Sequence, residues 1–250
     1  MTAATGDGDF AGRAGAALVV GGSGGLGRAI AEMLTARGSS VAVTFRTRAP
    51  EGAPAAYLLD LAEAGAAARV VEQVVADLGG LHTLVYAAGP HVPMTHLSRV
   101  EPEEMAGQLA ADSAGFFAVA HAALPALRES RGSIVAVTTA ATTRFPVRDG
   151  LSSAPKAAVE AMVRGLAVEE GRFGVRVNAV GPGMLTDGMV ERLISTGELS
   201  DADLAAAHGN IPLRRFGDAA DVAEAVCFLA SHRADFISGQ KLDVDGGYGA

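Results

Sequence analysis

The chain has 250 residues, of which 49% are hydrophobic and 19% charged, and it carries a net charge of −8. This length and hydrophobic content fit one sizeable domain with a large core. The acidic balance argues against a surface for nucleic acid or anionic membrane, since both attract basic proteins. No apolar run approaches the roughly 18 residues of a membrane span, and the first residues carry no signal pattern. We therefore expect a cytoplasmic protein that binds neither nucleic acid nor membrane.

The most informative stretch is a short apolar run at 16–20, followed by a glycine-rich turn and a helical pattern. Apolar residues recur at Leu26, Ile30, Met33 and Leu34, which predicts strand, tight turn and helix. Glycines leave backbone amides bare, so a pyrophosphate can approach them and the positive end of the helix. In an alanine- and glycine-rich chain such a run can also arise by composition. The expected phosphate-binding residues are Gly21, Ser23, Gly24, Gly25, Leu26 and Gly27.

Further buried-strand patterns alternate with helical patterns along the chain. The strands are expected at 40–45, 56–61, 81–86, 134–138, 175–179 and 241–244, and the clearest helices at 101–128, 153–170 and 219–229. Strands spaced in this way need crossover helices, which predicts a parallel sheet covered on both faces. We expect an α/β, doubly wound, Rossmann-type sheet of about seven strands in three layers. It forms a single domain over residues 14–250, with a flexible tail at 1–13 and a substrate lid at about 184–212.

In such a sheet, ligands bind beyond the carboxyl ends of the strands. The residues at those ends are Gly21, Arg46, Asp60, Ala87 to Gly89, Thr139 and Gly181 to Gly183. Functional residues are therefore expected along one edge.

With these motifs, the chain resembles the short-chain dehydrogenase/reductase family over nearly its whole length. V-G-G-S-G-G-L-G at 20–27 is similar to the family's T-G-x-x-x-G-x-G turn, and Y-A-A-G at 86–89 to its N-N-A-G. R-V-N-A-V-G-P-G at 176–183 and I-S-G-Q-K-L-D-V-D-G-G at 237–247 resemble its late strands. The resemblance implies a homotetramer and a nicotinamide cofactor. It places further cofactor contacts at Asp60, Leu61, Ala87, Ala88, Gly89, Lys156, Pro182, Gly183, Leu185 and Thr186.

Two positions bear on the nucleotide itself. The resemblance implies that Asp60 accepts a hydrogen bond from the adenine amino group, and the alternative is a strand-end cap. Arg46 and Arg48 follow the second strand, where an enzyme that prefers NAD would carry an acidic residue. An arginine there can pair with a 2′-phosphate, so NADP(H) is expected over NAD(H), unless both arginines are solvated surface residues.

The match fails in the catalytic set, which in the family is Asn, Ser, Tyr and Lys with the spacing Y-x-x-x-K. Lys156 is retained, Ser152 stands at the tyrosine position, and Thr139 and Asp112 stand at the serine and asparagine positions. These four are the expected catalytic residues. A serine hydroxyl is shorter and far less acidic than a phenol, so Ser152 cannot simply inherit the tyrosine's role. We favour Ser152 or Ser153 as a helix N-cap, with Pro155 in the first turn.

Three smaller points complete the site. Thr186 or Asp187 is expected at the family's carboxamide-binding threonine, and the spacing leaves this choice open. His91 and His96 lie in the loop after the fourth strand, where an ordinary loop histidine competes with a role as an acid. No histidine has metal-ligand spacing, so no metal is expected, and Cys227 lies in an apolar helical run typical of the core.

The leading hypothesis is an NADP(H)-dependent reductase of a small-molecule carbonyl substrate with a non-standard site. Its proton comes from Lys156, from a water held by Asp112 and Lys156, or from His91. One alternative is a nucleotide-binding protein without redox activity, in a regulatory or scaffold role. Another is a cofactor-independent isomerase or cyclase on the same fold.

Overall fold

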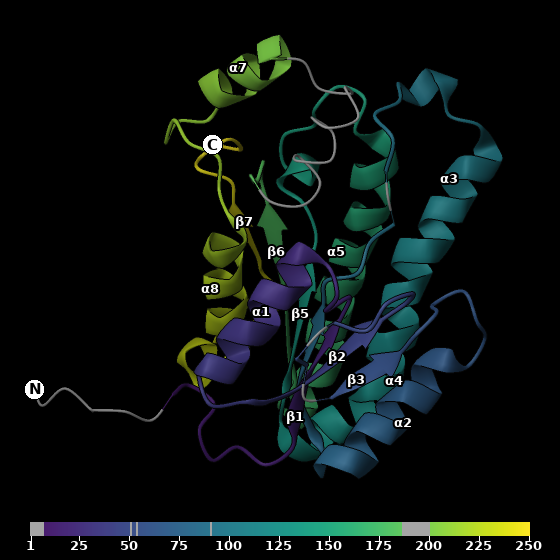
Figure 1. Ribbon diagram of the computed structural model, residues 1–250, viewed down its shortest axis with the longest axis vertical. Helices are drawn as coiled ribbons and strands as arrows, with labels where there is room; N and C mark the ends of the chain where they lie inside the picture. Colours follow the sequence, from purple (N-terminus) through teal and green to yellow (C-terminus); the bar gives the residue numbers. More distant parts are fainter. Residues whose placement is uncertain (1–7, 51, 54, 91, 187–200) are drawn as a thin grey trace, which may run out of the picture.

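The computed structural model describes residues 8–50, 52–53, 55–90, 92–186 and 201–250 (Figure 1). Within them, seven parallel strands form one sheet in the order β3-β2-β1-β4-β5-β6-β7. The order reverses direction between β1 and β4, which confirms the predicted doubly wound fold. The strands are β1 Ala16–Val20, β2 Ser40–Phe45, β3 Ala56–Leu58, β4 Leu81–Tyr86, β5 Ser133–Val137, β6 Arg176–Pro182 and β7 Lys241–Val244.

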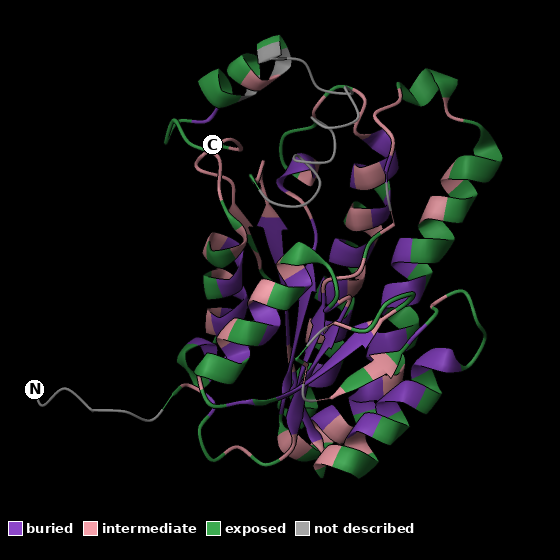
Figure 2. Ribbon diagram, viewed as in Figure 1, coloured by how far each residue is buried: buried purple, intermediate pink, exposed green. Residues whose placement is uncertain are grey.

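Helices cover both faces of the sheet. One face carries α1 Gly25–Ala36 and α8 Ala219–Ala230, and the other carries α2 Ala66–Leu78, α4 Gly115–Ser130 and α5 Gly150–Glu170 (Figure 1). Successive strand residues point to opposite faces. Leu18 and Val20 therefore pack with α2, α4 and α5, whereas Ala17 and Val19 pack with α1 and α8. In Figure 2 the strands are largely buried and the helices expose their outer sides.

Three helical boundaries differ from the sequence prediction. The predicted helix 101–128 is divided into α3 Pro102–Leu109, a π-helical turn η2 Ala110–Ala114, and α4. Helix α5 begins at Gly150, three residues before the predicted start. Helix α7, Asp201–Asn210, lies in the stretch that is predicted as a substrate lid. No helix is predicted there, because its apolar residues are mostly alanines without a helical stripe. The short 3₁₀ turns are η1 Leu97–Arg99, η3 Ala140–Thr142, η4 Gly171–Phe173 and η5 His232–Ala234.

The start of the chain packs against the domain from residue 8 onward. The side chain of Phe10 is 1% exposed and stacks on the ring of His82. Asp9 pairs with Arg37 at 3.1 Å, and the Phe10 amide donates to the Arg37 carbonyl. Of the stretch predicted as a flexible tail, 1–13, residues 9 and 10 therefore contact the domain, and residues 1–7 lie outside the described part.

Among the described residues, the helical segment Pro102–Ser130 is the one long and apolar enough to span a membrane by length and composition. The apolar residues of this segment belong to the core of the domain. Phe116, Val119 and Leu127 are fully buried against the sheet and the neighbouring helices.

The carboxyl ends of the strands meet at one edge of the sheet, at the top of Figure 1. Helix α7 lies beyond this edge, and η3 and the start of α5 lie beside it. Of the predicted lid at 184–212, residues 187–200 lie outside the described part.

Candidate active site at the carboxyl edge of the sheet

The turn between β1 and α1 is closed tightly by glycines. Gly21 has a φ of +87°, and a Cβ there would lie 2.8 Å from the backbone of Ala88. A Cβ on Gly27 would lie 2.2 Å from the Gly21 carbonyl oxygen. Only glycine fits these two positions without movement of the backbone.

The tip of the turn is open, in contrast to its base. Ser23, Gly24 and Gly25 are exposed, and a Cβ on Gly25 would meet no atom within 4 Å. The N-cap of α1 is Gly24, which has no side chain to bind the first amides of the helix. Bare amides at the positive end of a helix fit a pyrophosphate, so these residues suit a dinucleotide.

Thr44 supports this turn, and sequence reasoning missed it. Its side chain is 2% exposed on β2, and its Oγ1 accepts a hydrogen bond of 3.1 Å from the amide of Gly21. The only signal in the sequence was a hydroxyl residue inside an apolar strand.

The residues predicted for the nucleotide lie at the ends of β2 and β3. Arg46 is exposed and forms no ion pair with another described residue. Oδ1 of Asp60 accepts a hydrogen bond of 3.0 Å from the amide of Ala62 just after β3, which fits the strand-end cap considered as an alternative. Leu61 is half-buried against the core.

Lys156 lies between the ends of β4 and β5. Its Nζ is 3.0 Å from Oδ1 of Asp112, 3.2 Å from the Val137 carbonyl oxygen and 3.4 Å from the Ala88 carbonyl oxygen. Gly89 passes beside it, since a Cβ there would lie 3.7 Å from Nζ. The predicted residues Ala88 and Gly89 therefore border the lysine, whereas Ala87 packs against the core on the face of α1 and α8.

Asp112 reaches Lys156 from the π-helical turn η2. The carboxylate is 5% exposed and the lysine side chain 12% exposed, so the ion pair is largely shielded from solvent. Burial raises the pKa of Asp112, and the charge and hydrogen bond of Lys156 partly oppose this. The structure therefore brings together two of the four predicted catalytic residues in direct contact.

Thr139 and Ser152, the other two, are half-buried. Thr139 follows β5, and its Oγ1 accepts from the amide of Ala141 at 3.1 Å, which caps η3. Ser152 lies in the first turn of α5, one turn before Lys156. Among the described residues, the Ser152 hydroxyl makes no hydrogen bond.

The prediction that Ser152 or Ser153 caps α5 is wrong. The N-cap is Asp149, and its Oδ2 accepts a hydrogen bond of 2.7 Å from the Ser153 hydroxyl. The helix starts early because Arg148 takes a φ of +73° and Gly150 fits under Leu97, where a Cβ would lie 2.3 Å away. Pro155 is consequently inside the helix, beyond the first turn.

The residues predicted beside the nicotinamide follow β6. Pro182 ends the strand, and the amide of Gly183 donates to the Val244 carbonyl at 2.9 Å. Leu185 bridges to Gly217, and the Thr186 amide donates to the Gly217 carbonyl at 2.9 Å. Thr186 is exposed, and both Asp187 and His91 lie outside the described residues.

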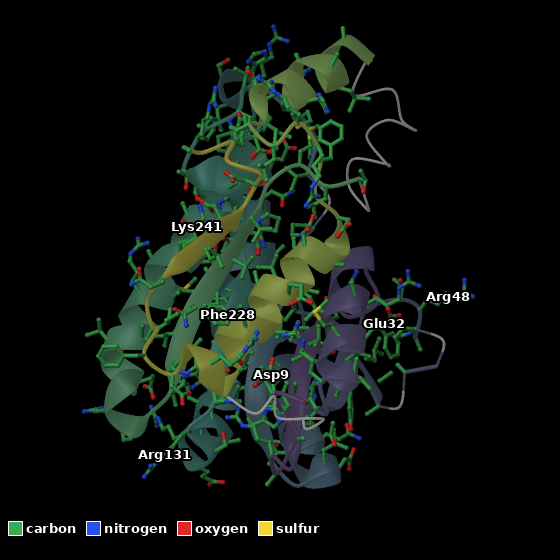
Figure 3. The ribbon with its side chains drawn as sticks, turned by 90° about the vertical axis from the view of Figure 1, so that its left-hand side faces the viewer. Asp9, Glu32, Arg48, Arg131, Phe228 and Lys241 are labelled. Carbon is green, nitrogen blue, oxygen red and sulfur yellow. The ribbon has the colours of Figure 1, made fainter. Side chains whose placement is uncertain are left out.

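A second charged cluster, which the sequence did not reveal, lies behind Thr139. Lys241, on β7 at the edge of the sheet (Figure 3), is 3.0 Å from Asp243 and 3.4 Å from Glu160. Thr142 donates to Glu160 at 2.8 Å. The cluster ties β7 and α5 to η3, the turn that follows Thr139.

The thiol of the chain's single cysteine belongs to the core. Cys227 is fully buried on α8, as predicted, and burial raises the pKa of its thiol to about 12. Within the described part of the chain, no group of three or more His, Cys, Asp or Glu side chains is placed to hold a metal ion.

Known proteins resemble the chain over nearly its full length. The family model described as enoyl-(acyl carrier protein) reductase matches residues 20–249. A (3R)-3-hydroxyacyl-CoA dehydrogenase from Canis lupus familiaris is 32% identical, covering 94% of this chain and 96% of the relative. A 3-oxoacyl-[acyl-carrier-protein] reductase from Bos taurus is 34% identical, covering 92% and 95%.

Solved structures also resemble the chain over nearly its full length. A short-chain dehydrogenase/reductase from Mycobacterium ulcerans has a TM-score of 0.87 at 28% identity, covering 96% of this chain and 91% of the other. A short-chain dehydrogenase from Burkholderia cenocepacia in complex with NADP has a TM-score of 0.84 at 30% identity, covering 94% and 98%. The chain belongs to the short-chain dehydrogenase/reductase family of oxidoreductases.

Proposed function

We propose that the protein is an NADP(H)-dependent oxidoreductase that interconverts a small carbonyl compound and its alcohol at a non-standard site. One observation carries this proposal: the open glycine turn and the pair Thr139 and Ser152 lie at the same edge of the sheet. A nucleotide bound at the turn and a substrate beside these hydroxyls would therefore lie along the same edge. The nicotinamide, when bound, supplies or accepts the hydride.

The cofactor-binding residues divide by position along this edge. The turn residues Gly21 and Ser23 to Gly27 hold the pyrophosphate, and Arg46 with Arg48 binds the 2′-phosphate. Asp60 and Leu61 border the adenine. The nicotinamide half lies against Ala87, Ala88, Gly89, Pro182, Gly183, Leu185 and Thr186.

Thr139 and Ser152 hold the carbonyl oxygen in this proposal, since both residues are half-buried, Thr139 follows β5 and Ser152 lies one turn before Lys156 on α5. Ser152 stands where the family has its tyrosine, and its hydroxyl is not used for capping. Lys156 and Asp112 form the charged floor of the site. Direct proton donation from Lys156 would require it to leave one of its three present acceptors, so a water beside this floor is the better proton source.

The relatives suggest where to look for the substrate. Their names specify 3-hydroxyacyl-CoA, 3-oxoacyl-[acyl-carrier-protein] and 4-formylbenzenesulfonate as compounds on which they act. Each of these is a carbonyl compound or the corresponding alcohol. We therefore propose 3-oxoacyl thioesters and aromatic aldehydes as the first members of a substrate panel.

A nucleotide-binding protein without redox activity is the second candidate. It is favoured by the engaged ammonium of Lys156 together with the short side chain of Ser152, which leaves no obvious proton donor at the oxygen. On either candidate we also propose a homotetramer, a cytoplasmic location and a substrate lid over 184–212.

The deciding experiment has two steps. NADPH and NADH are first titrated by calorimetry, and nicotinamide absorbance is then followed with the carbonyl panel. Tight NADPH binding with turnover of any member supports the oxidoreductase. NADPH binding without turnover of any member supports the second candidate, and failure to bind either cofactor contradicts both.

A further inference from the structure

We propose that Lys241 and Glu160 form a largely buried ion pair that positions the hydroxyl of Thr139 for the substrate. Lys241 lies on β7, at the edge of the sheet, and its ammonium contacts the turn η3, which follows Thr139 (Figure 3). In this proposal Lys241 acts through Thr139 and does not touch the ligand, so it is a positioning residue. The proposal rests on the proposed function in one respect, which is the role of Thr139 at the substrate oxygen.

The hydroxyl of Thr139 is oriented by the turn that it caps. A hydroxyl has one donor and two acceptor lone pairs. Oγ1 of Thr139 accepts a hydrogen bond of 3.1 Å from the amide of Ala141, which leaves its own proton for another acceptor. Because this bond closes the start of η3, a movement of η3 would turn the hydroxyl. A group that holds η3 in place therefore also orients the Thr139 proton.

Lys241 holds η3 through two adjacent hydroxyls. Its Nζ donates to Oγ1 of Thr142 at 2.5 Å and to Oγ1 of Thr143 at 3.0 Å. Thr142 is the last residue of η3, and Thr143 is its C-cap. Oγ1 of Thr142 also lies 3.1 Å from the Thr139 carbonyl oxygen and 2.8 Å from Oε1 of Glu160, and its single proton serves one of these two acceptors. The ammonium thus fixes the end of the turn whose start Thr139 caps.

Two carboxylates hold the ammonium in place. Nζ of Lys241 is 3.4 Å from Oε1 of Glu160, on α5, and 3.0 Å from Oδ1 of Asp243, on β7. The side chains of lysine, glutamate and aspartate are 16%, 10% and 23% exposed, so water screens these charges weakly. Loss of the cation would leave two carboxylates close together and largely buried, and their repulsion would separate the elements that carry them. The position of η3 therefore depends on the charge of Lys241.

Gly181 shows how closely this cluster approaches Thr139. A Cβ on Gly181, in β6, would lie 2.1 Å from Oδ1 of Asp243 and 2.6 Å from Cε of Lys241. The same Cβ would lie 3.1 Å from the carbonyl carbon of Thr139. The glycine therefore leaves the space in which the charged side chains and the backbone of Thr139 come together.

A second ion pair on α5 gives a matched control. Arg128 donates two hydrogen bonds of 2.7 Å to Glu170, whose side chain is 6% exposed. Lys241→Met and Arg128→Met each remove the cation that pairs with a buried glutamate on the same helix, so each should lower the free energy of unfolding. Glu170 lies ten residues beyond Glu160, which is about 15 Å along the helix. Only Lys241→Met removes a contact with η3.

Hydrogen exchange of the Ala141 amide, followed by NMR, tests the positioning without any ligand. This amide donates to the Thr139 hydroxyl, so its exchange reports on that bond, and Thr139→Val gives the rate without it. Lys241→Met should speed exchange at Ala141 at least about threefold, and Arg128→Met should leave it unchanged. An unchanged rate in Lys241→Met, with a faster one in Thr139→Val, would overturn the proposal.

Thr142→Val gives the same comparison if Lys241→Met does not fold. It removes the hydroxyl that lies between Lys241 and Thr139 and leaves both ion pairs of Lys241 in place. Exchange at Ala141 should again rise at least about threefold. Wild-type exchange in this variant would equally overturn the proposal.

The kinetic test is a double-mutant cycle on kcat/KM, with a substrate from the carbonyl panel. Thr139→Val and Lys241→Met should each lower kcat/KM about three- to tenfold, because each removes or misplaces one hydrogen bond to the substrate oxygen. Since Lys241 acts through Thr139, the double variant should lie within about twofold of Thr139→Val alone. Losses that multiply would show that Lys241 acts elsewhere and would overturn the proposal. Full activity of Thr139→Val, or no turnover of any panel member, would count against the proposed function, and exchange at Ala141 would still decide whether Lys241 positions Thr139.

Discussion

Gly27 and Gly21 approach so closely that a Cβ on Gly27 would lie 2.2 Å from the Gly21 carbonyl oxygen. We therefore predict that Gly27→Ala forces the turn apart. Overpacking of this kind costs about 1–3 kcal/mol of folding free energy, and it should also weaken NADP(H) binding. Thermal unfolding and calorimetric titration measure the two effects.

Gly25→Ala is the matched control for that turn. A Cβ there meets open space, and alanine is a better helix former than glycine, so stability should be unchanged or slightly higher. NADP(H) binding should still weaken, because the methyl group enters the space proposed for the phosphates. Unchanged binding in Gly25→Ala would argue against a pyrophosphate at this position.

Arg46→Ala tests the cofactor preference. A charge-assisted phosphate contact is worth about 1.5–3 kcal/mol, so NADPH binding should weaken about tenfold or more, and NADH binding should hardly change. Arg28→Ala, which removes an exposed i,i+4 pair with Glu32 on α1, serves as control and should leave both affinities unchanged. Equal losses for the two cofactors would contradict a 2′-phosphate site.

Ser152→Ala separates the substrate-binding role of this hydroxyl from a role in stability. Because Asp149 is the N-cap of α5, the variant should change the free energy of unfolding by less than about 0.5 kcal/mol. Loss of one hydrogen bond to the substrate oxygen should lower kcat/KM about three- to tenfold. Ser153→Ala should show the opposite pattern. It removes the hydrogen bond to Asp149, so the free energy of unfolding should fall by about 1 kcal/mol while kcat/KM stays unchanged. Full activity of Ser152→Ala would remove Ser152 from the site.

Most of the fold could be predicted because local patterns decide it. Buried strands such as β1 and β4 are continuous apolar runs, and the glycine at 27 is required by a contact within the turn itself. The start of α5 could not be predicted, because two serines and Pro155 imitate a helix start. The true start depends on Leu97, which packs over Gly150 from another part of the chain.

The candidate site also contains some residues that the sequence predicts and others that it does not. The positions of Lys156 and Asp112 follow from their spacing within recognisable motifs, and they prove to be in contact. The role of Thr44 and the cluster around Lys241 depend on which side chains meet between distant segments. No spacing along the chain contains that information.

The thiol of Cys227 should be inert in the folded protein. It is fully buried, and a pKa of about 12 leaves almost no thiolate at neutral pH. A disulfide reagent should therefore titrate no thiol in the native protein and one after denaturation. Rapid labelling of the native protein would show that α8 opens readily.

His82 should make the fold sensitive to mild acid. Its ring is 1% exposed between Phe10, Ser39 and Thr83, and burial lowers its pKa to about 4. In the unfolded chain the pKa is about 6.5, so the unfolded state binds the additional proton as the pH falls through this range. The contribution of neutral His82 to the free energy of unfolding is complete above pH 6.5 and amounts to about 3 kcal/mol. It is lost as the pH falls from about 6.5 to 4. His82→Gln should flatten the dependence of unfolding free energy on pH in that window, measured by urea denaturation, whereas His232→Gln, at an exposed position, should leave it unchanged. An equally steep loss in His82→Gln would assign the acid sensitivity to another group.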